Sequence, residues 1–146
     1  MLKNTIFPLL FVSFCLTFVG CGGEPKPDGF PVLYPISLTF TQEEEPCEDA
    51  VVQLLSLDNS PWSVAGMTGA RGITTFWTHG KFPGAPAGRY RVDIKKEELA
   101  TAANGDIQVY TLIDPNLTPI EIEVIAGKNS FEPFDLGKKV RVLLKP

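Results

Sequence analysis

Apolar and polar side chains alternate with a period of two along several short stretches of the chain. In PISLTFT (35–41), Ile36, Leu38 and Phe40 fall on one side of an extended backbone, and serine and threonine fall on the other. Seven further stretches share this alternation or are similarly rich in β-branched and aromatic residues: 50–57, 63–68, 73–78, 89–95, 120–125, 130–136 and 139–144. Residues that favour turns separate them. This spacing predicts an all-β fold, specifically a seven- or eight-stranded β-sandwich.

The same alternation predicts which side chains face the core. In AVVQLLSL (50–57) the inner set is Ala50, Val52 and Leu54, and in RYRVDIK (89–95) it is Tyr90, Val92 and Ile94. In ITTFWT (73–78), Phe76 is expected to face inward and Trp77 outward. The only helical candidate is KKEELATAANG (95–105), for which one or two turns are expected before Asn104-Gly105 ends them.

The first twenty residues have the pattern of an export signal rather than of a folded domain. Lys3 precedes an apolar run from Ile6 to Val19, and Gly20 and Cys21 follow it. As a helix this run would extend about 21 Å, short of the ~30 Å hydrocarbon core, so a permanent membrane span is not expected. The end of the run, Phe18-Val19-Gly20-Cys21, resembles the lipobox of bacterial lipoproteins. The resemblance implies cleavage after residue 20 and acylation of Cys21, which would anchor the chain to a membrane; the alternative is an ordinary secretory signal with Cys21 a plain thiol.

Residues 21–31 are expected to form a flexible tether. GGEPKPDGFP (22–31) holds three glycines, three prolines and one aromatic residue, too little apolar surface to order itself. The folded domain is then 32–146. Gly22 stands where an aspartate retains lipoproteins at the inner membrane of some bacteria, so we expect the outer membrane and a domain outside the cytoplasm.

The net charge and the cysteine content limit which partners and which crosslinks are expected. The whole chain has a formal charge of −4, and loss of Lys3 with the signal leaves 12 basic against 17 acidic residues, or −5. Without a basic patch, nucleic acid is not an expected partner. Cys15 leaves with the signal and Cys21 is assigned to lipid, so Cys47 remains alone and no disulfide holds the domain together.

The stretch from 50 to 94 carries a family resemblance. Ala50, Val52 and Leu54, then Thr68, Gly69 and Gly72, then Pro86, Gly88, Tyr90 and Val92 match the pattern of the carboxypeptidase regulatory-like domain. That domain is a transthyretin-like sandwich related in architecture to immunoglobulin-like folds, and the chain resembles small bacterial lipoproteins that carry it after a proline-rich tether. The resemblance covers roughly 34–94 and continues more weakly to the end. It implies a fold rather than an activity.

Three positions depart from the family's pattern. Asp49 stands where the pattern has glycine, and aspartate adopts a left-handed backbone more readily than most residues do. Gly69 replaces the usual aspartate of the turn. Cys47 occupies a position where apolar residues are common, which favours a partly buried small side chain over a reactive thiol.

Catalytic and metal-binding motifs are absent from the sequence. No serine lies in a Gly-x-Ser-x-Gly setting, and His79 is the only histidine, so a hydrolase is the third-ranked alternative and no enzyme is expected. One histidine and one cysteine cannot supply the usual zinc ligands. The acidic residues of 43–49 are expected to form a solvated loop, with Ca²⁺ binding as the alternative. No cofactor is expected.

Two surface features remain as binding candidates. Trp77, Trp62 and Phe82, with Tyr110, could offer an aromatic platform to a glycan or peptide. THGKFPGAPAGRYRV (78–92) lacks the Ser or Thr after Lys81 that a phosphate-binding loop needs, so it is interpreted as a rigid connection into a strand. Lys81 and Arg89 could form a weakly basic rim. The sequence therefore predicts a lipid-anchored envelope domain with a non-catalytic structural or protein-interaction role, and a carbohydrate- or peptide-binding module as the alternative.

Overall fold

A computed structural model describes residues 24–144. The predicted signal peptide (1–20) and the lipidated Cys21 lie outside the described residues. The chain divides into two compact units, Met1–Phe30 and Pro31–Pro146.

The described part of the first unit, residues 24–30, contains a turn. The amide of Phe30 donates a hydrogen bond of 3.1 Å to the carbonyl of Pro27, with Gly29 at a φ of 72°. The Lys26 ammonium lies 5.6 Å from the centre of the Phe30 ring. The proline-rich stretch is therefore not extended throughout, because glycine allows the backbone to reverse after Pro27.

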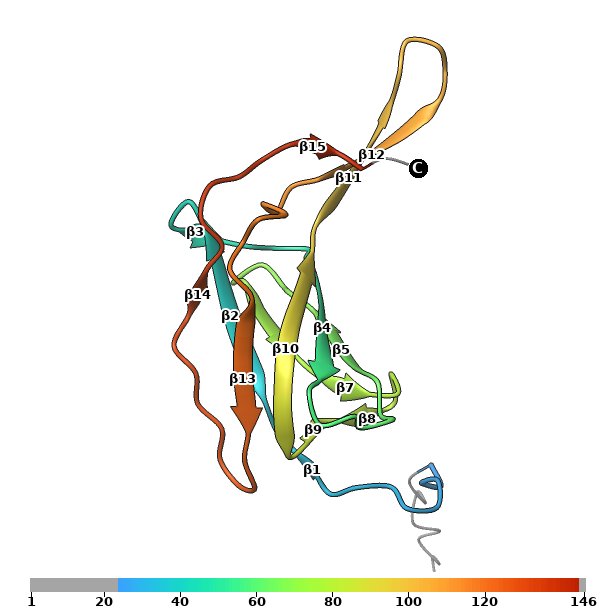
Figure 1. The fold of residues 1–146 in the computed structure, drawn as a ribbon, viewed down its shortest axis with the longest axis vertical. Coiled ribbons are helices and arrows are strands. Elements are labelled where there is room, and N and C mark those ends of the chain that lie inside the picture. Colours follow the sequence, from blue (N-terminus) through green and yellow to red (C-terminus); the bar gives the residue numbers. More distant parts are fainter. Residues whose placement is uncertain (1–23, 145–146) are drawn as a thin grey trace, which may run out of the picture. The chain divides into compact units, whose positions relative to one another are not determined.

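Six strands of the second unit form an antiparallel sheet, in the order β13-β10-β4-β5-β7-β8 (Figure 1). Their bounds are β4 Val51–Ser56, β5 Val64–Met67, β7 Trp77–Thr78, β8 Phe82–Pro83, β10 Gly88–Lys95 and β13 Ile120–Val124. The eight-residue β10 is the longest and pairs along most of its length with β4. This sheet is called the main sheet below.

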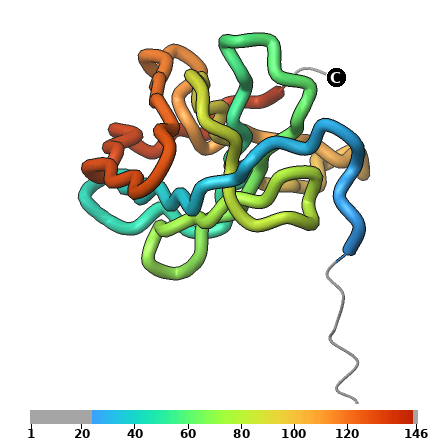
Figure 2. The backbone as a smooth tube through the Cα atoms, turned by 90° about the horizontal axis from the view of Figure 1, so that it is seen from below, coloured from blue at the N-terminus to red at the C-terminus, as the bar shows by residue number. Residues whose placement is uncertain are grey.

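A second sheet forms around β2 (Ser37–Gln42). β14 (Phe134–Asp135) pairs with β2 in parallel, and β3 (Glu45–Pro46) and β6 (Ile73–Thr75) pair with it antiparallel. In Figures 1 and 2 the red segment around β14 lies beside the cyan β2. Phe76 separates β6 from β7, so the chain crosses from the second sheet to the main sheet at a buried aromatic residue.

The remaining strands lie outside these two sheets. β1 (Leu33–Tyr34) pairs with β9 (Ala85–Pro86). β11 (Glu97–Thr101), β12 (Ile107–Thr111) and β15 (Val142–Leu143) form a three-stranded sheet whose β11–β12 hairpin projects beyond the main sheet (Figure 1). This three-stranded sheet is called the arm below.

The arm corrects the sequence prediction for 95–105. The expected helical turns are wrong, because the segment forms β11 and pairs over five residues with β12. Leu99, Ala102 and Ala103 made only a weak helical face, and pairing with a strand that the sequence had not predicted supplies more hydrogen bonds. Asn104-Gly105 closes the hairpin turn instead of ending a helix, with Gly105 at a φ of 87°.

The core confirms the predicted inward faces. Ile36, Leu38 and Phe40, Ala50, Val52 and Leu54, and Tyr90 and Val92 are buried, and Ile94 is half-buried against them. Phe76 is 1% exposed and Trp77 44%, as the alternation predicts. Residues of the main sheet and of the second sheet contribute to one core cluster. The described chain has no helix, and its arrangement is all-β and consistent with a β-sandwich.

Candidate functional site

Trp77 lies on the outer face of the main sheet. The ladder places it directly opposite Ala65 of β5 and Pro83 of β8. Its neighbours in sequence, Phe76 and Thr78, are buried, so the pleat turns the indole toward solvent. With a small and a flat partner on its two sides, Trp77 remains 44% exposed.

More apolar side chains share this outer face. Val51 and Met67 lie directly opposite one another on β4 and β5 and are 39% and 60% exposed, and Leu55, four residues along from Val51, is 37% exposed. Gln53 lies between Val51 and Leu55 and pairs with Ala65, the neighbour of Trp77. We define the apolar strip by its members: Val51, Leu55, Ala65, Met67, Trp77 and Pro83.

A second feature of the sequence, besides the alternation of inward and outward residues, indicates the apolar strip. In the stretch 51–55 apolar residues occupy both parities, which is typical of strands covered on both faces. The core covers Val52 and Leu54, whereas the described residues leave Val51 and Leu55 exposed. Apolar side chains gathered on one exposed face in this way are typical of contact sites.

Charged residues border the strip along the next two strands. Arg89, Arg91 and Lys95 project from β10 on the same outer face, since they alternate with the buried Tyr90 and Val92. On β13, Glu123 lies opposite Arg89 and Glu121 opposite Arg91. The outer face is therefore divided into an apolar half and a half with both signs of charge.

The other aromatic candidates lie elsewhere. Phe82 is opposite Thr78, which is buried, so Phe82 belongs to the core-facing side of the same sheet and is half-buried. Trp62 precedes β5, and its ring stands edge-on to the His79 ring, with centroids 5.1 Å apart and planes at 73°. Tyr110 belongs to the arm, where the Arg141 guanidinium lies 3.7 Å from its ring centre. The structure thus does not bring Trp77 and Phe82 onto one face.

His79 occupies a tight turn between β7 and β8. Its φ is 53° and that of Gly80 is 67°, and the Lys81 amide donates to the Thr78 carbonyl across 3.2 Å. The His79 backbone donates to the Ser63 carbonyl. Within residues 24–144, neither a serine nor a carboxylate forms a hydrogen bond with the imidazole. His79 therefore fits the hairpin connection that the sequence predicts for this segment.

Arg89, one of the two residues of the predicted basic rim, forms an ion pair with Asp58. The Arg89 guanidinium lies 3.0 Å from Asp58, and the Arg89 backbone amide donates to the same carboxylate at 2.8 Å. These bonds, the amide bond first, hold the pKa of Asp58 below its usual value. Arg89 is thus already engaged by an anionic side chain, which leaves less charge for an external anion.

The acidic segment 43–49 forms a turn and then re-enters the core. Glu43 and Glu44, at φ values of 55° and 68°, connect β2 to β3 as a two-residue hairpin turn. Asp49 has a φ of 56°, which agrees with the left-handed backbone expected where the family pattern has glycine. In the part of the chain that is described, no three His, Cys, Asp or Glu residues are grouped so as to hold a metal ion.

Cys47 is a core residue. It is 2% exposed and unpaired, and burial raises the pKa of its thiol. This is more buried than the sequence predicted. A buried thiol of raised pKa is a poor nucleophile, which agrees with a packing role.

Comparison with known proteins assigns no family. Neither a protein-family model, nor a curated protein, nor a solved structure matches the chain. Across residues 24–144, no helix is long and apolar enough to span a membrane.

Proposed function

We propose that this chain is an exported, lipid-anchored domain of the cell envelope that contacts another envelope protein and catalyses no reaction. The single observation that carries the interaction role is the apolar strip on the outer face of the main sheet, with Met67 60% and Trp77 44% exposed. Burying these side chains against a partner contributes about 25 cal/mol per Å² of apolar surface. The charged half beside the strip would orient that partner.

The fold of the domain is proposed to be that of the carboxypeptidase regulatory-like, transthyretin-like family, as a β-sandwich. Three features support this. The positions that match the family's apolar pattern are buried, among them Ala50, Val52 and Tyr90. Gly72 has a φ of 68°, and a Cβ there would collide with the Phe40 carbonyl. Asp49 takes the left-handed backbone at the family's glycine position.

Anchoring is proposed to depend on Cys21. Each buried methylene of an acyl chain contributes about 0.8 kcal/mol, and one chain alone binds a membrane only marginally. The two or three chains of lipoproteins would make the attachment effectively permanent. The signal pattern of residues 1–20 supports export, and the glycine at position 22, where an aspartate would retain the chain at the inner membrane, supports the outer membrane.

A carbohydrate-binding role is the second candidate, and Trp77 is the observation that favours it. An exposed indole between Ala65 and Pro83 offers a flat face for a sugar ring. Because Phe82 lies on the other face of the sheet, it would not extend the stacking surface of Trp77. A protein partner would use the whole strip.

Crosslinking in intact cells tests the proposal. A photoreactive amino acid is placed at Met67 in the strip, and at the exposed Glu132 as a control. We expect one dominant protein adduct from position 67, none from 132, and loss of that adduct in Trp77→Ala. Equal adducts from both positions, or none, would contradict a protein contact through the strip.

Two further experiments test the lipid anchor and the carbohydrate alternative separately. Cys21→Ser should move the protein into the soluble fraction, and retention in the membrane would contradict the lipid anchor. Binding of purified protein to isolated envelope glycan, lost in Trp77→Ala but unchanged in Met67→Ala, would favour the carbohydrate alternative over a protein partner.

A further inference from the structure

The main sheet ends at β13, which leaves one side of that strand unpaired. β13 pairs with β10 from Gly88↔Val124 to Val92↔Ile120, and no other described strand pairs with it (Figure 1). The chain that follows β13 continues to β14, which pairs with β2 of the second sheet. At the opposite edge of the main sheet, β8 is two residues long and contains Pro83, which limits pairing there. β13 is thus the longer open edge of this sheet.

The register shows which main-chain groups of β13 are free. On the β4 side of β10, the Arg89 carbonyl accepts a hydrogen bond of 2.9 Å from the Leu57 amide. Because alternate residues of a strand point their amides and carbonyls to the same side, Tyr90 rather than Arg89 bonds to β13, where its partner is Ile122. The amides and carbonyls at positions 121 and 123 therefore point away from β10. In the described part of the chain, no hydrogen bond reaches these groups.

Asn129 closes one end of this edge. Its side-chain oxygen accepts from the Ile125 amide at 2.9 Å, and its side-chain amide donates to the Ile125 carbonyl at 3.1 Å. Ile125 is the next residue whose main chain points outward, so the Asn129 side chain makes the bonds that a neighbouring strand would make. The domain thus caps its own edge at Ile125 and leaves Glu121 and Glu123 open.

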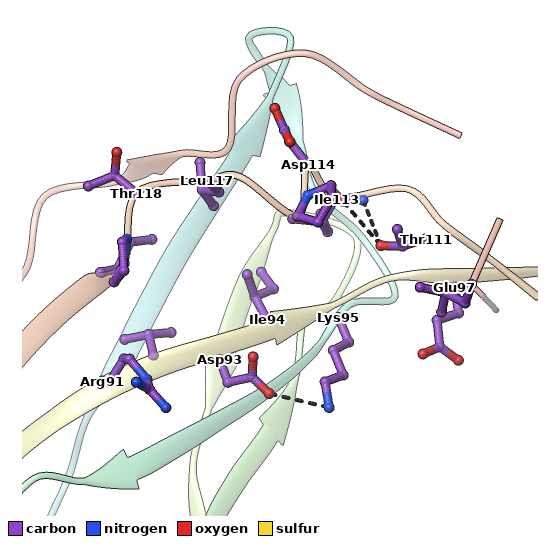
Figure 3. Close-up of a pocket in the computed structure, with 15 residues that line it drawn as sticks. Arg91, Asp93, Ile94, Lys95, Glu97, Thr111, Ile113, Asp114, Leu117 and Thr118 are labelled. Atoms are coloured by element: carbon purple, nitrogen blue, oxygen red, sulfur yellow. Dashed lines mark hydrogen bonds and ion pairs between the residues drawn. The ribbon is translucent and has the colours of Figure 1, made fainter. Parts of the chain in front are cut away.

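Pro119 marks the other end of the open edge. It has no amide, so only its carbonyl can bond on the outward side. Figure 3 shows Leu117 and Thr118 on the segment that leads into β13, where this segment lines a cleft of about 400 Å³. The open edge is therefore confined to the stretch between Pro119 and Ile125, which has room for one short strand.

Two glutamates give this edge its charge. The side chains of Glu121 and Glu123 are exposed, and within residues 24–144 neither carboxylate forms an ion pair. Arg89 lies opposite Glu123, but its guanidinium is bonded to Asp58. Antiparallel pairing with β13 of a second copy would place glutamate opposite glutamate, which destabilises a sheet. The charges therefore oppose self-association of this edge and favour a strand of opposite charge.

The other face of β13 belongs to the core. Ile122 is 7% exposed and Val124 1%. A strand that continued the sheet would alternate in the same way as β13, with one side chain beside Ile122 on the core-facing side and its neighbours beside the glutamates on the outer face. This alternation matches a segment in which one apolar residue separates two basic residues.

We propose that the outer edge of β13 binds an extended segment of a partner protein, which adds as one further antiparallel strand with basic side chains opposite Glu121 and Glu123. The residue between them is apolar and lies beside Ile122. Bonds to the free amides and carbonyls supply part of the affinity, and the cross-strand charge pairs select the sequence. This contact is separate from the apolar strip, whose members lie on β4, β5, β7 and β8.

Two blocked pentapeptides of opposite charge test the specificity. Thr-Lys-Val-Lys-Thr and Thr-Glu-Val-Glu-Thr are titrated into the isotope-labelled full-length chain, and binding is followed by NMR. The lysine peptide should bind at least about fivefold more tightly, because attractive cross-strand pairs replace repulsive ones. Glu121→Gln with Glu123→Gln should reduce this ratio to less than about twofold. The matched control, Glu44→Gln with Glu48→Gln, removes exposed carboxylates from another loop and should leave the ratio unchanged.

The positions of the bonds test the mode of binding. The lysine peptide should slow hydrogen exchange of the Glu121 and Glu123 amides more than that of the Ile122 amide, which is already paired with β10. N-methylation of both peptide lysines should weaken binding at least about tenfold, because their amides would bond to β13. N-methylation of the central valine, whose amide would point away, should change binding less than about twofold.

Four results would each overturn the proposal: equal binding of the two peptides, no binding at millimolar concentration, an unchanged ratio in the Glu121 and Glu123 variant, or equal effects of the two N-methylations. A basic peptide that adhered to the acidic surface without adding as a strand would give the last of these. Trp77→Ala should leave the affinity for the lysine peptide unchanged, so the test does not depend on the proposed role of the strip.

Discussion

The Tyr90 hydroxyl donates a hydrogen bond of 2.9 Å to the carbonyl of Pro86, four residues earlier in the chain. Tyr90 is 1% exposed, so the bond joins the start of β10 to β9 inside the core. Burial, followed by the nearby Asp58 charge, raises the pKa of Tyr90 above its usual value of 10.0. The hydroxyl is therefore protonated and able to donate at neutral pH.

Tyr90→Phe should lower the free energy of unfolding by about 1–3 kcal/mol, because a buried carbonyl loses its donor. Chemical denaturation at pH 7 measures this change. Tyr34→Phe is the control, since the described residues supply no hydrogen bond to that hydroxyl, and it should change the free energy by less than about 0.5 kcal/mol. The difference between wild type and Tyr90→Phe should shrink above pH 10, because a group of raised pKa stabilises the fold below its unfolded pKa and loses that effect as the pH rises. Equal effects of both variants would contradict this role of the bond.

Asp58 should make stability depend on pH in the acidic range. Its pKa is lowered in the folded state by the bonds from Arg89, so its contribution is present above the unfolded pKa and is lost as the pH falls through the folded one. Thermal unfolding of Asp58→Asn and wild type should differ at pH 7 and converge below about pH 3. Asp28→Asn, in the first unit, serves as control and should leave the midpoint unchanged. A constant difference at every pH would point to lost packing rather than to charge.

Gly84 should tolerate no side chain. Its φ is 101°, and a Cβ would lie 2.6 Å from the Tyr34 carbonyl oxygen, where β1 approaches β9. Gly84→Ala should lower the free energy of unfolding by about 1–3 kcal/mol from backbone strain, and further through the collision. A Cβ at Gly69 would lie 3.9 Å from its nearest neighbouring atom, the Ile73 carbonyl oxygen. Gly69→Ala should therefore change the free energy of unfolding by less than about 0.5 kcal/mol. Urea denaturation compares the two, and similar losses would contradict the argument.

Cys47 should react slowly with thiol reagents. In the exported chain with Cys21→Ser it is the remaining thiol after removal of the signal, and burial both shields it and raises its pKa. At pH 8 we expect the native protein to react at least about a hundredfold more slowly with an aromatic disulfide reagent than the urea-unfolded protein does. Native and unfolded rates that agree within a factor of about three would show that the thiol is accessible.

The aromatic residues show what strand alternation can predict and what it cannot. Strand alternation predicted that Phe76 is inside and Trp77 outside, and both are so. It could not predict that Phe82 lies on the opposite face from Trp77, because that depends on the register Thr78↔Phe82 between two strands. A turn one residue longer would have placed Phe82 on the outer face.

The sequence by itself determined the all-β class, the inward sides of β2, β4 and β10, and the turn at Gly72, because these follow from local geometry: the two-residue pleat and the freedom of glycine. Only the tertiary structure decided that 97–101 is a strand and that β13 is an edge of the main sheet. It also decided that Val51 and Met67 meet on an uncovered face. Each of these depends on which distant segments pair and in which register, and a weak local preference yields to the hydrogen bonds and burial that such pairing supplies.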